Sequence, residues 1–204
     1  QALIEAAERG VAVHVVFDGF ANLVVSREFK RWPDPIHKLE YPVFRPQVFL
    51  GPRHWGRDHR KILVVDGEVG FVGGYNIGEE YATQWRDTHV RVTGPAAHEL
   101  ENTFVDFWNH HRREGQPCLS DDRVREWGHQ VRAHRNAPSR LLFPVRGMYL
   151  EAIDRASETV WITQGYFIPD SEILEELLKA RRRGVDVKVI LPERSNHVVA
   201  DWVA

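Results

Sequence analysis

Two stretches near opposite ends of this 204-residue chain repeat one pattern. The first covers residues 3–16 and the second residues 177–190, so that Gly184 lies 174 positions after Gly10. Each stretch reads as a helix that ends at the glycine, a common helix C-cap, followed by a strand of alternating valines. Self-similarity over this length predicts two copies of one helix–strand unit, and therefore an α/β fold with two lobes.

The residues before the second copy extend this unit. We expect a helix over Met148–Ser157, a strand over Thr159–Thr163, and a loop from Tyr166 that ends near a helix N-cap at Asp170. Shifted back by the repeat spacing, the helix and the strand fall before Gln1. We therefore expect the first copy to lack its opening helix and strand.

The remaining segments complete a three-part organisation. Residues 1–113 form the first lobe, which closes with a helix over residues 96–111, where large apolar residues recur every four positions. Residues 114–140 are polar and are expected to connect the lobes, with one short helix over residues 122–133. Residues 141–204 begin the second lobe.

The composition narrows the class of protein. Apolar residues make up 43% of the chain, enough for a packed core, and no apolar run reaches the length of a membrane span. Cys118 is the only cysteine, so no internal disulfide forms and nothing indicates an oxidising compartment. The net charge of −2 gives no indication of general nucleic-acid binding.

The stretch from Arg31 to Lys61 has a different charge balance. Seven basic residues stand against three acidic ones: Arg31, Lys38, Arg45, Arg53, Arg57, Arg60 and Lys61 against Asp34, Glu40 and Asp58. Such a stretch is either a solvated basic loop or a collar that attracts anionic substrates. Both interpretations stay open at this point.

One string carries most of the chemical information. It reads H-x-K-x4-D-x6-G-G-x-N and consists of His59, Lys61, Asp66, Gly73, Gly74 and Asn76. His59 and Lys61 open an apolar run two positions apart, so a strand would project both from one face. Burying an imidazole beside an ammonium costs free energy unless a ligand such as a phosphate satisfies them. The spacing therefore predicts a phosphoryl site in which His59 is the nucleophile.

A hairpin is predicted to complete this site. Residues 64–69 read as a strand, an Asp-Gly turn and a returning strand, which brings Gly73, Gly74 and Asn76 next to the histidine. Glycines let a ligand approach the backbone, and Asn76 and Lys61 supply donors for phosphate oxygens. These donors would stabilise charge on a five-coordinate phosphorus, whereas the plainer interpretation of Gly-Gly-x-Asn is a turn.

The string resembles the signature of the phospholipase D superfamily, and residues 85–90, Trp-Arg-Asp-Thr-His-Val, are similar to its bacterial cardiolipin synthase-like branch. The resemblance implies phospholipase D-like lobes, each a mixed β-sheet flanked by helices, with one lobe nearly complete and a second one begun. It also implies a two-step reaction without metal or cofactor. His59 forms a phosphohistidine, and a histidine of the other lobe protonates the leaving alcohol. The repeat spacing places that second His-x-Lys near position 233, beyond Ala204.

Two aspartates are candidates for orienting the nucleophile. Asp66 belongs to the motif, but about 23 Å of extended strand separates it from His59, so we predict a structural role in the turn. Superfamily members carry an acidic residue at about the position of Asp87, just before a strand expected over residues 88–92. We predict that Asp87 fixes the imidazole tautomer and stabilises the imidazolium; the alternative is a surface carboxylate at a strand end.

The other histidines do not form a metal site. His110 and His111 are adjacent, and adjacent side chains on a helix point about 100° apart. The remaining histidines show no ligand spacing. Three aromatic residues near the motif, Trp55, Tyr75 and Trp85, either line an acyl or glycerol channel or serve as core and rim packing.

Three functions are compatible with these residues. The first is a phospholipid transferase or hydrolase, as in cardiolipin synthase-like transfer from phosphatidylglycerol, at the cytoplasmic face of the cell membrane. Such a protein would be peripheral or anchored by a segment before Gln1, and would not bind nucleic acid. The second is a superfamily nuclease that cleaves DNA or RNA, and the third is binding of phosphorylated ligands without turnover. We expect little or no turnover from these 204 residues alone, because the second histidine lies outside them.

Overall fold

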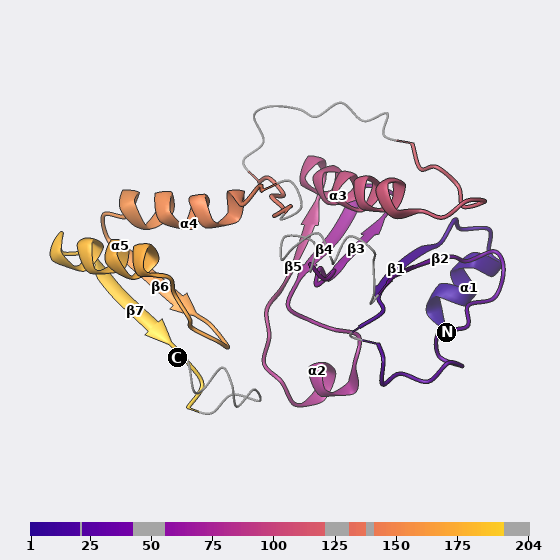
Figure 1. The fold of residues 1–204 in the computed structure, drawn as a ribbon, viewed down its shortest axis with the longest axis horizontal. Coiled ribbons are helices and arrows are strands. Elements are labelled where there is room, and N and C mark those ends of the chain that lie inside the picture. The colour runs from indigo at the N-terminus through magenta and orange to yellow at the C-terminus, as the bar shows by residue number, and fades with distance from the viewer. Residues whose placement is uncertain (21, 43–55, 121–130, 138–140, 194–204) are drawn as a thin grey trace. The chain divides into compact units, whose positions relative to one another are not determined.

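A computed structural model describes residues 1–20, 22–42, 56–120, 131–137 and 141–193 (Figure 1). The chain divides into two compact units, residues 1–133 and 134–204, each built from helices and short strands. The expected mixed α/β composition is confirmed. Most of the short helix expected over residues 122–133 lies outside the described residues. No helix in the described part of the chain is long and apolar enough to cross a membrane.

The first unit opens with the predicted helix and strand. Helix α1 (Ala2–Glu8) is followed by Gly10, whose φ of 91° lies in the left-handed region that favours glycine. Strand β1 (His14–Asp18) then pairs in parallel with β2 (His37–Tyr41) along its whole length. Strand β2 was not predicted from the sequence, because its alternating residues lie within a segment dominated by charge.

A three-stranded antiparallel sheet follows, in the order β3 (Ile62–Val65), β4 (Val69–Gly73), β5 (His89–Thr93). The predicted hairpin joins β3 to β4. Asp66 and Gly67 both have positive φ, 53° and 66°, which Asp and Gly tolerate better than other residues. A short helix, α2 (Glu79–Thr83), lies in the connection from β4 to β5.

Helix α3 (Pro95–His111) supplies part of the core of this unit and begins and ends within one residue of its predicted bounds. It buries Leu100, Val105 and Trp108 and packs against β2 and the three antiparallel strands, which lie beneath it in Figure 1. The packing against β4 is close, because a Cβ at Gly70 would lie 2.7 Å from the Leu100 Cδ1. Helix α3 therefore holds the antiparallel sheet and the β1–β2 pair in one unit.

The second unit repeats the helix–strand pattern. It contains α4 (Pro144–Arg155), β6 (Thr159–Thr163), α5 (Ser171–Arg182) and β7 (Asp186–Ile190), with β6 and β7 paired in parallel. Strand β6 has its predicted bounds, whereas α4 begins four residues before the expected Met148, with Pro144 in its first turn. Gly184 has a φ of 96°, close to that of Gly10, so the two copies end their helices in the same way.

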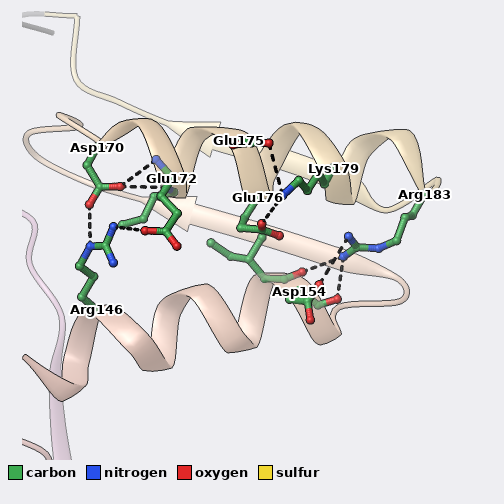
Figure 2. Close-up of polar contacts among 10 residues, drawn as sticks. Arg146, Asp154, Asp170, Glu172, Glu175, Glu176, Lys179 and Arg183 are labelled. Carbon is green, nitrogen blue, oxygen red and sulfur yellow. Dashed lines mark hydrogen bonds and ion pairs between the residues drawn. The ribbon is translucent and has the colours of Figure 1, made fainter.

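Charged contacts fasten α4 to α5 at both ends, as Figure 2 shows. Asp170 is the predicted N-cap, and its carboxylate accepts hydrogen bonds from the backbone N–H groups of Glu172 and Ile173. Arg146 of α4 donates to the same carboxylate at 2.7 Å, which lowers the pKa of Asp170. At the other end, Arg183 donates to the backbone carbonyl of Asp154 at 2.7 Å.

Candidate active site

The predicted nucleophile lies just before a strand, and the prediction that it shares a strand face with Lys61 was wrong. Residues 56–61 belong to no helix or strand, and β3 begins at Ile62. The physical reason is a competing hydrogen bond. The backbone N–H of Asp58 donates to the Asp18 carboxylate at the end of β1, at 2.9 Å, and the segment leaves the β3–β4 ladder.

Side-chain anchors nevertheless impose an alternating pattern on this segment. Arg60 donates to the Asp58 carboxylate at 2.7 Å, and its guanidinium lies 4.1 Å from the centre of the Phe107 ring of α3. Asp58 and Arg60 are therefore held against the scaffold, while His59 between them is exposed. The alternation that the sequence attributed to a strand is produced here by two anchored side chains.

Lys61 lies beside the histidine. Its ammonium donates to the backbone carbonyl of His59 at 2.8 Å. Burial, and next the charges of Lys61 and Arg57, lower the pKa of His59 from its usual value, although Asp18 and Asp58 oppose this. Burial likewise lowers the pKa of Lys61. A lowered pKa keeps the imidazole unprotonated near neutral pH, which is the form able to attack phosphorus.

Asp18 is the residue that the sequence analysis missed. Its side chain is only 6% exposed; besides Asp58 it pairs with Arg57, whose Nε lies 3.6 Å from its Oδ1. Arg57 also lies over the Phe20 ring, 4.6 Å from its centre. Asp18 thus joins β1 to the His59 segment across 40 positions of sequence. The available signal was an aspartate at the carboxyl end of a valine strand, where α/β proteins often place functional polar groups.

The two glycines are required by packing against β5. A Cβ at Gly74 would collide with both carboxylate oxygens of Asp87, and one at Gly73 would collide with the backbone of Thr88 and with His89. Gly74 also donates its N–H to the Thr88 carbonyl at 3.3 Å. The glycines therefore let Asp87 lie directly against the end of β4.

Asp87 is half-buried and accepts a hydrogen bond from the N–H of Thr88 at 2.6 Å. Its charge raises the pKa of Lys61, which opposes the lowering by burial. Within the described residues no hydrogen bond joins it to His59, so its orienting role stays a prediction. Strand β5 begins at His89, one residue later than expected.

Asn76 lies beside a series of aromatic rings. Its amide donates to the Tyr81 hydroxyl at 2.6 Å, which leaves its second N–H to donate elsewhere. The Tyr81 ring packs edge-on against Trp85, and Tyr75 packs against both Tyr81 and His89. Tyr75 and Trp85 are thus part of the packing next to the site, and Trp55 lies outside the described residues.

The remaining predictions concern Asp66, the basic residues and metal binding. Asp66 lies in the hairpin turn, at the far end of β3 from the histidine, as the structural interpretation requires. Of the basic residues from Arg31 to Lys61, Arg57 and Arg60 pair with Asp18 and Asp58, and the collar stays one of two open interpretations. Arg45 and Arg53 lie outside the described residues. Among the residues that the structure describes, no group of His, Cys, Asp or Glu side chains is placed to hold a metal ion.

Comparison with known proteins identifies the family. A family model described as "Cardiolipin synthase, PLD-like domain" matches residues 1–108 and 149–204. Cardiolipin synthase A of Pseudomonas fluorescens (strain SBW25) is 35% identical to 96% of the chain, which covers 42% of that protein. Cardiolipin synthase A of Pseudomonas putida is 34% identical, with 97% of the chain and 42% of that protein aligned.

The enzyme of the same name from Pseudomonas syringae pv. syringae (strain B728a) is 35% identical over 97% of the chain and 43% of that protein. The chain thus spans less than half the length of these curated relatives. The resemblance drawn from the His59–Asn76 string is confirmed. The chain belongs to the cardiolipin synthase, phospholipase D-like domain family.

Proposed function

We propose that the protein is a phospholipase D-type phosphatidyltransferase that moves a phosphatidyl group between phospholipids through a phosphohistidine at His59. The observation that carries the proposal is the held segment around His59. The backbone of this segment donates a hydrogen bond to the buried Asp18, the pKa of His59 is lowered, and the Lys61 ammonium lies beside His59. Membership of the cardiolipin synthase-like family supports the choice of a phospholipid as substrate.

In the first step, a ring nitrogen of His59 attacks the phosphodiester phosphorus. A P–N bond forms and the P–O bond to the leaving alcohol breaks, and a histidine of the second lobe supplies the proton that the alkoxide takes up. Lys61 and the second N–H of Asn76 stabilise the charge on the non-bridging oxygens. Asp87 stabilises the imidazolium-like ring.

In the second step, the histidine of the second lobe takes the proton of the acceptor alcohol. The alcohol oxygen attacks phosphorus, the P–N bond breaks and His59 is restored. A second phosphatidylglycerol as acceptor gives cardiolipin and releases glycerol from the first, whereas water as acceptor gives hydrolysis. The choice of acceptor therefore decides between transferase and hydrolase.

The proposal includes a location and partners. The substrate is phosphatidylglycerol or a similar phospholipid, so the protein works at a membrane surface, on its cytoplasmic face. The second histidine comes from the lobe whose opening elements are α4 to β7. The repeat of the first lobe's helix–glycine–strand pattern in this lobe supports that assignment.

A product assay tests the proposal. The complete protein is incubated with phosphatidylglycerol vesicles in the presence of EDTA, and lipids are separated for cardiolipin and glycerol release. We expect product from the parent protein and from His110→Asn, a matched change at an exposed histidine, and none from His59→Asn. Cleavage of DNA or RNA by the same preparation, without lipid turnover, would favour a superfamily nuclease instead.

A further inference from the structure

The connection between β1 and β2 carries large apolar side chains that remain exposed to solvent. Three of them are largely exposed: Leu23 at 62%, Val24 at 94% and Phe29 at 68%. Connections of this kind are usually polar, and apolar residues gathered in one of them indicate a surface that binds a partner. The segment is held in turns, since Val25 donates its N–H to the Asn22 carbonyl at 3.2 Å.

The same connection forms one wall of a basic pocket. The pocket has a volume of about 260 Å³, and Phe17 of β1 and Glu40 of β2 belong to its lining. Its other lining residues are all cations: Arg27, Lys30, Arg31, Lys38 and Arg113. A volume below the roughly 300–1,000 Å³ of sites for drug-sized ligands suits a headgroup phosphate better than a whole lipid.

Hydrogen bonds join the three segments that supply these cations. The Lys38 ammonium of β2 donates to the Lys30 carbonyl of the connection at 3.3 Å. Gln116, which follows α3, donates its amide to the Lys38 carbonyl at 2.6 Å and accepts from the N–H of Arg113 at 2.7 Å. The pocket is therefore assembled before any ligand arrives.

The positive charge of the pocket is not neutralised from within. Among the lining residues that the structure describes, Glu40 is the one carboxylate, against five cations. In the described part of the chain, no ion pair joins any of these five to an acidic side chain, whereas Arg57 and Arg60 near the active site are both paired. Cations kept together without counter-charges favour an anionic ligand.

We propose that this surface, residues 22–31 together with the basic pocket, docks the protein on an anionic phospholipid bilayer. Leu23, Val24 and Phe29 enter the interface, and the pocket holds a lipid headgroup phosphate. Exposed apolar side chains beside clustered cations are the combination by which peripheral segments bind anionic membranes. The choice of a bilayer rests on the proposed function, which needs a membrane-embedded substrate.

Vesicle binding by the 204-residue chain tests this docking surface. Co-sedimentation is measured with vesicles of phosphatidylcholine alone and of phosphatidylcholine mixed with phosphatidylglycerol. The charge variant Arg27→Gln/Arg31→Gln is compared with Arg181→Gln/Arg182→Gln, which removes the same charge from exposed positions of α5. We expect the pocket variant to bind the mixed vesicles roughly 25-fold more weakly, at about five-fold per cation near an anionic surface.

The apolar arm uses Leu23→Ser/Phe29→Ser against Leu178→Ser, a partly exposed leucine of α5. We expect the loop variant to lose at least about ten-fold in vesicle affinity, because two side chains no longer enter the bilayer. Circular dichroism spectra like that of the parent chain establish that each variant is folded. Equal binding by the pocket variant and its α5 control would overturn the proposal.

Two further outcomes distinguish membrane docking from nucleic-acid binding and from the proposed catalytic function. Tight binding of a single-stranded oligonucleotide that falls in the Arg27/Arg31 variant, without vesicle binding, would assign the pocket to nucleic acid and overturn the docking surface. The variant His59→Asn is expected to bind vesicles as the parent chain does. If the chain binds vesicles through these residues but the complete protein makes no lipid product, the proposed function fails and the docking surface stands.

Discussion

Replacing Asp18 by alanine tests how the fold holds its nucleophile. The substitution removes the carboxylate that accepts the Asp58 N–H at 2.9 Å, and a hydrogen bond to a charged group contributes about 1.5–3 kcal/mol. It also removes the pairing with Arg57, which contributes about 0–1 kcal/mol because the arginine is half-exposed. Together the loss is about 1.5–4 kcal/mol, which corresponds to roughly 10- to 700-fold easier opening of the His59 segment.

Hydrogen exchange measured by NMR follows that opening directly. We expect the Asp58 amide to exchange faster by about this factor in Asp18→Ala. In Asp18→Asn the increase should be smaller, because the amide oxygen still accepts the bond. Glu8→Ala, an exposed carboxylate of α1, serves as the control and should leave the Asp58 amide unchanged.

A catalytic consequence follows in the complete protein. A displacement of a reacting group by about 1 Å can lower a rate about 100-fold, so Asp18→Ala should reduce kcat by that order with a smaller change in KM. Partial rescue in Asp18→Asn would mark the hydrogen bond as the cause. If the Asp58 amide exchanges at the parent rate in Asp18→Ala, the anchoring argument is refuted, whatever the activity.

Three other predictions test the remaining parts of the site. Burial and the charge of Lys61 lower the pKa of His59, so its neutral form persists below the usual pKa of 6.5. The rate of phosphoenzyme formation should therefore fall to half its maximum at a pH below 6.5. Lys61→Met should raise this midpoint pH while lowering the rate. Gly74→Ala should destabilise the first unit by about 1–3 kcal/mol in chemical denaturation and lower activity, because its Cβ collides with the Asp87 carboxylate. Asp87→Asn should reduce kcat more than Asp66→Asn does, because the charge of Asp87 acts on Lys61 whereas Asp66 lies in the turn.

Each of these results has an outcome that contradicts it. A midpoint at or above pH 6.5 in the parent protein would show that the imidazole is not held neutral. Gly147→Ala, at a position of α4 where a Cβ meets open space, is the control for Gly74→Ala and should be neutral or slightly stabilising. A larger loss in Asp66→Asn than in Asp87→Asn, at equal folded stability, would invert the two assignments.

Short sequence patterns predicted the turns and helix ends that depend on the conformational preferences of single residues. The Asp66-Gly67 turn, the Asp170 N-cap and the helix ends at Gly10 and Gly184 all depend on the conformations that these residues favour, and each is present where it was expected. The bounds of α3 and β6 followed from apolar spacing in the same way.

Contacts between distant residues were beyond the reach of these patterns. The strand predicted through His59 was wrong: the backbone N–H of Asp58 donates to Asp18, 40 positions earlier, and β3 begins only at Ile62. Strand β2 forms because its residues pair with β1, and its own composition gave little sign of it. The expectation that Gly74 admits a ligand stays a prediction, and only the folded arrangement reveals that its missing side chain also makes room for Asp87.

The most direct test of the central claim is detection of the covalent intermediate. The complete protein is mixed with phosphatidylglycerol, quenched during turnover and digested, and the peptide containing His59 is analysed by mass spectrometry. We expect an acid-labile phosphatidyl adduct on His59 that is absent in His59→Asn. An adduct on another residue, or one that persists undiminished in His59→Asn, would contradict it.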